Sequence, residues 1–160
     1  MSLASTHNGA FIWPIPEIIR RKRDAIEGRV TSIYSPPFYT GQHGYKMCMR
    51  VYLNGDGIGY MTYLSIFFVL MKGEFDALLK WPFNHKVSLI LVDQNHQKHI
   101  VQTFRPTAGS SSFTRPVADM NIASGCPQFA KLTVLEDENY VKDDVLFIKC
   151  IVDTSKIVHP

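Results

Sequence analysis

The chain has 160 residues, of which 46% are hydrophobic and 19% are charged, a balance typical of one folded domain rather than of a disordered or fibrous protein. Its formal net charge of +3 is too small to indicate a nucleic-acid partner. No apolar run approaches the ~20 residues that cross a bilayer, so we expect no direct membrane insertion.

Segments rich in β-branched and aromatic residues alternate along the chain with turn formers, a pattern that predicts strands joined by short connections. Eight strands are expected, at Ala10–Trp13, Val30–Tyr34, Tyr45–Leu53, Thr62–Met71, Lys86–Asp93, Lys98–Phe104, Gln128–Leu135 and Asp144–Val152. Two short helices are expected, at Ile15–Ile26 and Phe75–Leu79. The predicted fold class is therefore all-β, with two packed antiparallel sheets.

The strand expected at Tyr45–Leu53 carries the most informative pattern. Side chains alternate between the faces of a strand, so Arg50 and Tyr52 share one face. The other face is apolar and includes Met47 and Val51. We expect the guanidinium and the phenol to project together toward solvent.

The cysteines are odd in number, widely spaced and set in or beside apolar runs, at Cys48, Cys126 and Cys150. This usage is typical of reduced, buried thiols in an intracellular protein.

Residues that could support catalysis or metal binding occur without the patterns that those functions need. Asp143, Asp144 and the serines at 110–112 could serve a hydrolase, but there is no nucleophile elbow, Cys–His signature or HExxH helix. His96 and His99 lack a third ligand at a matching spacing and are interpreted as part of a turn. We expect no catalytic residue, no metal and no cofactor, and an enzyme remains only a minor alternative.

Two further segments have a plain structural interpretation. The basic run Arg20–Arg23 is followed at once by Asp24 and Glu27, so it is interpreted as a solvated helix face. The glycines within Asn54–Gly59 lack the Gly-Lys-Ser/Thr and the helix of a phosphate loop and are interpreted as a hairpin. A β-sandwich without visible chemistry is typical of a recognition or scaffold domain.

More specific motifs cover the chain from about Asn8 to Thr154. They are Phe38-Tyr39-Thr40 with Gly44–Cys48, Tyr52–Gly57, Leu78–Phe83, Ser110–Phe113, Met120–Pro127 and Tyr140–Asp144. Together they resemble the C-terminal domain of TNF receptor-associated factors, the TRAF or MATH fold, more than other MATH domains such as the speckle-type or meprin chains. The resemblance implies an eight-stranded antiparallel sandwich with a shallow peptide groove.

The same resemblance suggests how the chain is organised. Residues 1–7 are expected to be disordered or artificially added, residues 8–155 to form the TRAF domain, and residues 156–160 to form a tail. A RING domain and a coiled coil are lacking, so ubiquitin-ligase activity would lie elsewhere, and the whole protein would be a homotrimer through the missing coiled coil.

The resemblance also implies a function and a cytoplasmic location. The domain would act as an adaptor that binds Pro/Ser-x-Gln/Glu-Glu-like motifs in cytoplasmic tails of TNF-receptor family members and in adaptor proteins. It would couple them to NF-κB and MAP kinase signalling, innate immunity and the regulation of apoptosis. The alternative is a MATH-type domain that recruits substrates to a ubiquitin ligase or protease, with a preference for Ser/Thr-rich, non-acidic peptides.

Site residues follow from the resemblance by position. Arg50 and Tyr52 would bind the acidic side chain of the peptide. The hydroxyls that would bind its Gln or Glu belong to Ser110, Ser111 and Ser112. Asp56 and Gly57 would lie at the acid-reading end of the groove. The pocket for the first peptide residue would be formed by Phe67, Phe104, Phe113, Ser124 and Gly125, and Arg105 and Ala123 complete the set.

One end of this groove departs from the family pattern. Tyr60, Met61 and Tyr63 stand where relatives usually carry a basic residue, Gly and His. We therefore expect the acid-reading end to be less positive and more aromatic than in those relatives.

Overall fold

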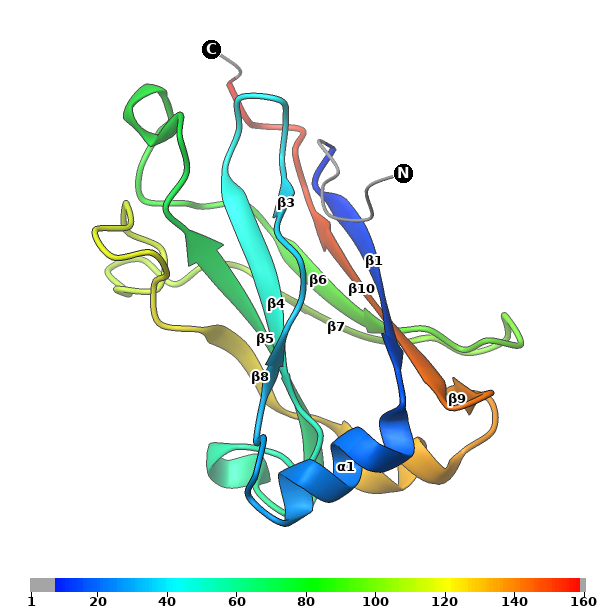
Figure 1. Ribbon diagram of the computed structural model, residues 1–160. Coiled ribbons are helices and arrows are strands. Elements are labelled where there is room, and N and C mark those ends of the chain that lie inside the picture. Colours follow the sequence, from blue (N-terminus) through cyan, green and yellow to red (C-terminus); the bar gives the residue numbers. More distant parts are fainter. Residues whose placement is uncertain (1–7, 159–160) are drawn as a thin grey trace.

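Two antiparallel sheets face one another in the computed structural model, which describes residues 8–158 (Figure 1). One sheet has the strand order β1 (Ala10–Pro16), β10 (Val145–Val152), β6 (Val87–Leu91) and β7 (Ile100–Phe104), with β9 (Val141–Lys142) paired to β10. The other has the order β2 (Ile33–Tyr34), β4 (Lys46–Tyr52), β5 (Tyr63–Met71) and β8 (Ser124–Lys131), with β3 (Phe38–Tyr39) paired to β4. The predicted all-β sandwich of antiparallel strands is confirmed.

Each of the eight expected strands has a counterpart, but some bounds differ. The strand expected at Gln128–Leu135 instead begins at Ser124 and ends at Lys131, and Leu132–Glu136 forms the 3₁₀ helix η3. Ser124 and Gly125 have weak strand propensity, yet they pair with Phe68 and Phe67 of β5, so tertiary pairing overrides propensity. The two-residue strands β3 and β9 were not predicted.

The helices are also shorter than expected. The predicted helix at Ile15–Ile26 is the α-helix α1 (Ile18–Ile26), because Ile15 and Pro16 complete β1 opposite Leu146 and Val145. The helix expected at Phe75–Leu79 is the 3₁₀ helix η2 (Asp76–Leu78). No helix within residues 8–158 has the length and apolar character that crossing a membrane requires.

Asp144 fixes the start of α1. Its carbonyl oxygen accepts the Ile18 N–H over 3.2 Å, and its carboxylate accepts the Ile19 N–H over 2.9 Å. These contacts satisfy N–H groups that have no partner inside the helix. Arg20 forms surface ion pairs with Glu17 and Asp24, which agrees with a solvated face for the basic run.

The core lies between the sheets. Met47 and Val51 of β4 are fully buried, as are Leu89 and Leu91 of β6. The apolar face expected for β4 is therefore confirmed, but Cys48, on the opposite face with Arg50, is buried as well.

The cysteines have no disulfide partner. Cys48 and Cys150 are buried, and Cys126 is half-buried. Burial raises the pKa of the Cys48 thiol to about 11 and raises the pKa of Cys150 as well. Both thiols are therefore protonated and poorly reactive at neutral pH.

Two expected segment boundaries fall near the chain ends. Residues 1–7, expected to be disordered or added, lie outside the described residues, as do residues 159–160 of the expected tail. Within the described part of that tail, Ile157 packs against the core and its N–H donates to the Thr154 carbonyl over 3.1 Å.

Candidate functional site

A groove of about 320 Å³ lies on the outer face of β4 and β5. Register places Arg50 beside Phe67 and Tyr52 beside Ser65, so these side chains share the face opposite the core. Five residues expected at the site line the groove, namely Arg50, Tyr52, Asp56, Phe67 and Ala123. The structure therefore brings together one part of the expected set.

Arg50 is held between two phenol rings. Its guanidinium carbon lies 4.7 Å from the centre of the Tyr34 ring and 5.0 Å from that of Tyr52. Its Nε donates a hydrogen bond of 2.9 Å to Ser32 Oγ. None of the ion pairs among residues 8–158 involves Arg50. A half-buried cation is thus fixed in direction without an anion to neutralise it.

The Tyr52 phenol lies beside this cation. Its ring meets the Phe67 ring edge-on, with the centres 5.7 Å apart. Burial raises the pKa of Tyr52 and the Asp56 charge adds to the rise, while the Arg50 charge and a side-chain hydrogen bond with Ser32 oppose it. The hydroxyl is therefore protonated at neutral pH and can donate a hydrogen bond into the groove.

Asp56 marks one end of the groove. Its backbone N–H donates to Ser65 Oγ over 2.9 Å, and that hydroxyl donates to the Pro127 carbonyl over 2.6 Å. The chain then enters the 3₁₀ helix η1 (Gly57–Gly59), where the exposed Gly57 has a φ of 56°. Gly57 follows the groove without lining it.

The serine loop, which we define as residues 107–116, lies next to the opposite end. Ser110 is half-buried, Ser111 is exposed and Ser112 is buried, and none of them lines the groove itself. Asn121 joins the loop to the groove, because its side-chain amide donates to the carbonyls of Ser112 and Thr114 over 3.1 and 2.7 Å. The backbone N–H of Asn121 donates to Leu70 in β5 over 2.9 Å.

The three phenylalanines expected in one pocket occupy different surroundings. Phe104 and Phe113 have ring centres 6.3 Å apart, and both also contact rings of the core. Phe67 contacts Tyr52 on the outer face, and within residues 8–158 no ring contact joins it to Phe104 or Phe113. The expected pocket would therefore have to span the edge of the sheet.

β8 forms that edge, since it is the last strand in its sheet. Gly125 of β8 pairs with Phe67, and a Cβ at this glycine would lie 2.7 Å from the Ile66 carbonyl and 3.0 Å from the Phe67 Cα. Only glycine permits this approach between the strands. Ser124 and Gly125 are half-buried, so the edge remains partly open to solvent.

Arg105 lies apart from the groove lining. Hydrogen bonds from Ser155 lower the pKa of Asp153, and the charges of Lys86 and Arg105 lower it further. The exposed Arg105 is therefore close enough to Asp153, the residue after β10, for their charges to interact.

Sequence reasoning missed half of the groove lining. These residues are Tyr34, Val69, Met120, Asn121 and Ile122. Tyr34 of β2 lies opposite Arg50 of β4, and the Asn121 N–H donates to the Leu70 carbonyl of β5. Both relationships depend on strand register, which periodicity in one segment does not reveal.

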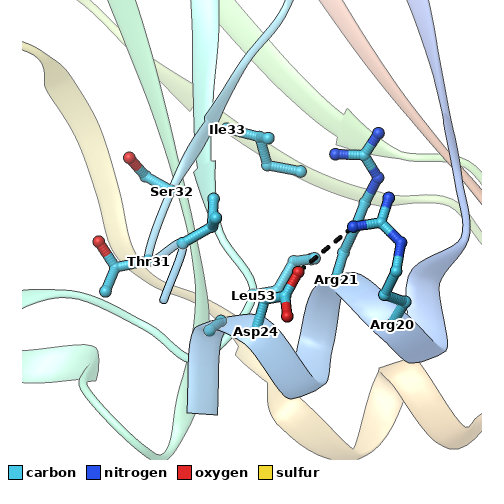
Figure 2. Close-up of a pocket in the computed structure, with 9 residues that line it drawn as sticks. Arg20, Arg21, Asp24, Thr31, Ser32, Ile33 and Leu53 are labelled. Atoms are coloured by element: carbon cyan, nitrogen blue, oxygen red, sulfur yellow. Dashed lines mark hydrogen bonds and ion pairs between the residues drawn. The ribbon is translucent and has the colours of Figure 1, made fainter. Parts of the chain in front are cut away.

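A second cavity, of about 70 Å³, lies under α1 (Figure 2). Arg20 and Arg21 reach over it, with Arg20 paired to Asp24, and Ile33 contributes to its apolar wall. The hydroxyl of Ser32 points away from these arginines in Figure 2, which agrees with its bond to Arg50. The cavity is thus bordered by Ser32, the residue that orients the Arg50 guanidinium in the groove.

His96 and His99, which the sequence indicated as part of a turn, lie in a turn that is held by hydrogen bonds to Asp93. The Asp93 carboxylate accepts backbone N–H groups of Lys98, Asn95 and Gln97 over 2.7, 2.8 and 3.3 Å. The Asp93 N–H donates to His99 Nδ1 over 2.8 Å. Within residues 8–158, no three His, Cys, Asp or Glu side chains gather in a way that could hold a metal ion.

Comparisons with known proteins agree with the resemblance seen in the motifs. A family model described as TRAF/meprin, MATH domain, matches residues 30–149. TNF receptor-associated factor 2 of Homo sapiens is 58% identical over 151 residues, which cover 94% of this chain and 30% of that protein. TNF receptor-associated factor 5 of Homo sapiens is 50% identical over 153 residues, which cover 94% of this chain and 28% of that protein.

A solved structure of Notothenia coriiceps TRAF5 superposes with a TM-score of 0.93 and 40% identity, covering 98% of this chain and 79% of that chain. This chain spans less than a third of the length of the curated relatives named above. The resemblance inferred from the motifs is confirmed. The chain therefore belongs to the TRAF/meprin MATH-domain family, among the C-terminal domains of TNF receptor-associated factors.

Proposed function

We propose that this domain is a non-catalytic adaptor module that binds short extended peptides from cytoplasmic receptor tails and signalling adaptors. The names of its relatives support receptors of the TNF-receptor kind as the source of these peptides. One observation carries the proposal: the Arg50 guanidinium is oriented by Ser32 and two phenols, and has no carboxylate partner among the described residues.

An acidic side chain of the peptide would supply the missing anion. Its carboxylate would accept hydrogen bonds from the Arg50 terminal N–H groups and from the Tyr52 hydroxyl. Hydrogen bonds to charged groups contribute about 1.5–3 kcal/mol each. Asp56 and Gly57 would flank this contact, and Asp56 would favour a basic residue further along the peptide.

The peptide backbone would add to the edge of β8 by β-augmentation. Main-chain hydrogen bonds would give affinity, and side-chain contacts on alternate residues would give specificity. Ser124 and Gly125 support this binding mode because both are only half-buried in the last strand of the sheet.

Hydroxyl groups would recognise the Gln or Glu of the motif. Ser110, Ser111 and Ser112 can donate as well as accept, so either side chain could be bound. The first peptide residue, Pro or Ser, would occupy a small pocket at the sheet edge. That pocket would involve Phe67, Phe104, Phe113, Ala123, Ser124 and Gly125, with Arg105 further away.

A shallow groove that reads about four side chains would bind weakly, with a Kd on the order of 0.1 to 1 mM. Trimerisation through a coiled coil elsewhere in the protein would raise avidity for clustered receptors by a factor of ~100 or more. The domain would thereby couple receptor clustering to NF-κB and MAP kinase signalling and to the regulation of apoptosis. Any ubiquitin-ligase activity would lie in a RING domain outside these residues.

A titration with matched peptides tests the proposal. One peptide contains a Pro-x-Gln-Glu motif and the second has Gln in place of the Glu. We expect Arg50→Ala to weaken the acidic peptide about tenfold or more and to change the neutral peptide little, because only the former offers a carboxylate. A variant with Ser110, Ser111 and Ser112 changed to Ala should weaken both. If the unaltered protein and both variants bind the two peptides with the same affinity, the groove is not the peptide-binding site. A preference for Ser/Thr-rich, non-acidic peptides would instead favour substrate recruitment.

A further inference from the structure

Apolar side chains are exposed just past the Asp56 end of the groove. The exposed fractions are 76% for Ile58, 58% for Tyr60 and 67% for Met61. Single exposed apolar residues are common, but three within four positions of one loop form a local patch, and such patches often mark a binding site. We call Ile58, Tyr60 and Met61 the apolar rim.

Backbone contacts hold the apolar rim in one shape. The Tyr60 N–H donates to the Gly57 carbonyl over 3.2 Å, and the Met61 N–H donates to the Asn54 carbonyl over 2.7 Å. Met61 has a φ of 68°, a conformation that costs a residue with a Cβ about 1 kcal/mol or more. Two backbone hydrogen bonds therefore support the conformation in which the loop exposes its apolar side chains.

The apolar rim is packed against the sheet edge. A Cβ at Gly59 would lie 2.0 Å from the Pro127 carbonyl, so the loop rests directly on β8. The Leu132 N–H donates to the Thr62 carbonyl over 3.0 Å, which joins the end of the loop to the residue after β8. Figure 1 shows the η1 segment beside the lower ends of β5 and β8.

Strand register defines where a peptide on β8 would go. Ser124 lies opposite Phe68, Gly125 opposite Phe67 and Cys126 opposite Ile66, and Ser65 then bonds to Pro127. A peptide that pairs with the free edge of β8 runs along the same line. One of its ends is therefore carried past the Arg50 level to Pro127, where the loop of the apolar rim rests.

We propose that the apolar rim binds one large aliphatic or aromatic side chain of the same peptide, on the flank that passes Asp56. This inference rests on the proposed function. Gly125 lies at the level of Arg50 and Pro127 follows two residues later, so that side chain would lie about two to four residues from the acidic residue. Asp56 lies between the two contacts and disfavours a second acidic residue there by like-charge repulsion.

A peptide series tests the inference. The acidic peptide carries Ala at all flanking positions, and Leu or Trp is introduced singly at each position up to four residues from the acidic residue on either side. We expect one flank to contain a position where Leu or Trp increases affinity about five- to twentyfold, in line with burial of a large apolar side chain.

A variant of the loop then tests whether the apolar rim is responsible for this gain in affinity. It combines Ile58→Ser and Tyr60→Ser with Met61→Gly, which keeps a residue suited to positive φ. The variant should lose the Leu or Trp gain, and its own affinity for the all-Ala peptide is the baseline from which that gain is measured. Val117→Ser, at a residue 90% exposed outside both surfaces, is the matched control and should keep it.

Two negative outcomes are distinguishable. If Arg50-dependent binding is present but no flanking position responds to Leu or Trp, or if the gain survives in the loop variant, the apolar rim is not a binding surface and the proposed function stands. If no peptide binds in an Arg50-dependent manner, the proposed function fails and this inference fails with it.

Discussion

Arg50 and Ser32 are joined by a hydrogen bond from Nε to Oγ of 2.9 Å. They are 18 positions apart in the sequence and meet because β2 pairs with β4. The bond occupies the Nε proton, fixes the guanidinium plane between two phenols, and leaves the terminal N–H groups for a ligand. Ser32 is therefore a positioning residue for the candidate site.

Ser32→Ala should weaken binding of an acidic peptide by about three- to tenfold, because an unanchored guanidinium must be ordered when the ligand binds. Binding of the matched neutral peptide should change little, and this difference is measured by calorimetry on the two peptides. Thr31→Ala alters the exposed neighbouring hydroxyl and is the control. An equal loss for both peptides would indicate a general disturbance of the groove rather than a positioning role.

Asn121→Ala should detach the serine loop from the groove. The change removes two side-chain hydrogen bonds, to the Ser112 and Thr114 carbonyls, but keeps the backbone bond to Leu70. We expect a loss of about 1–2 kcal/mol in the free energy of unfolding, measured by urea denaturation.

Asn121→Ala should lower not only the free energy of unfolding but also the affinity for peptides that contain the Gln of the motif. A control is Asp119→Ala, since its side chain is exposed and its contact to Lys72 is made by the backbone carbonyl. Unchanged stability in Asn121→Ala would mean that the loop is held by its other contacts.

Asp93 should make folding stability depend on pH. Backbone hydrogen bonds, that from Lys98 above all, lower the pKa of Asp93 in the folded protein. A carboxyl whose folded pKa is depressed stabilises the fold above its unfolded pKa of ~3.9, and this contribution is lost as the pH falls through the lower folded pKa. Asp93→Asn should therefore be less stable than the unaltered protein at pH 7.

The stability difference between the two proteins should shrink as the pH falls below about 4, because the native carboxylate is then protonated as well. Urea denaturation at pH 7, 5 and 3 measures it. Asp119→Asn, at an exposed carboxylate, serves as the comparison. A difference between Asp93→Asn and the unaltered protein that is the same at every pH would assign the effect to altered turn geometry rather than to charge.

Several features could be predicted from the sequence because they depend only on local backbone geometry. Side chains alternate along any strand, so the shared face of Arg50 and Tyr52 follows once Lys46–Tyr52 is extended. The same alternation identifies the buried face that begins with Met47. Short β-rich segments between turn formers likewise indicated an all-β sandwich without any long-range information.

Tertiary structure alone decided which distant residues meet. Tyr34 stacks on Arg50, and Asn121 holds the serine loop, because register brings separate segments together. The neighbours Phe67 and Phe68 diverge, one to Tyr52 on the outer face and the other to Phe104 in the core. A one-residue shift of register would exchange the faces of every side chain on a strand, and no single segment encodes that choice, because it depends on the packing of both sheets.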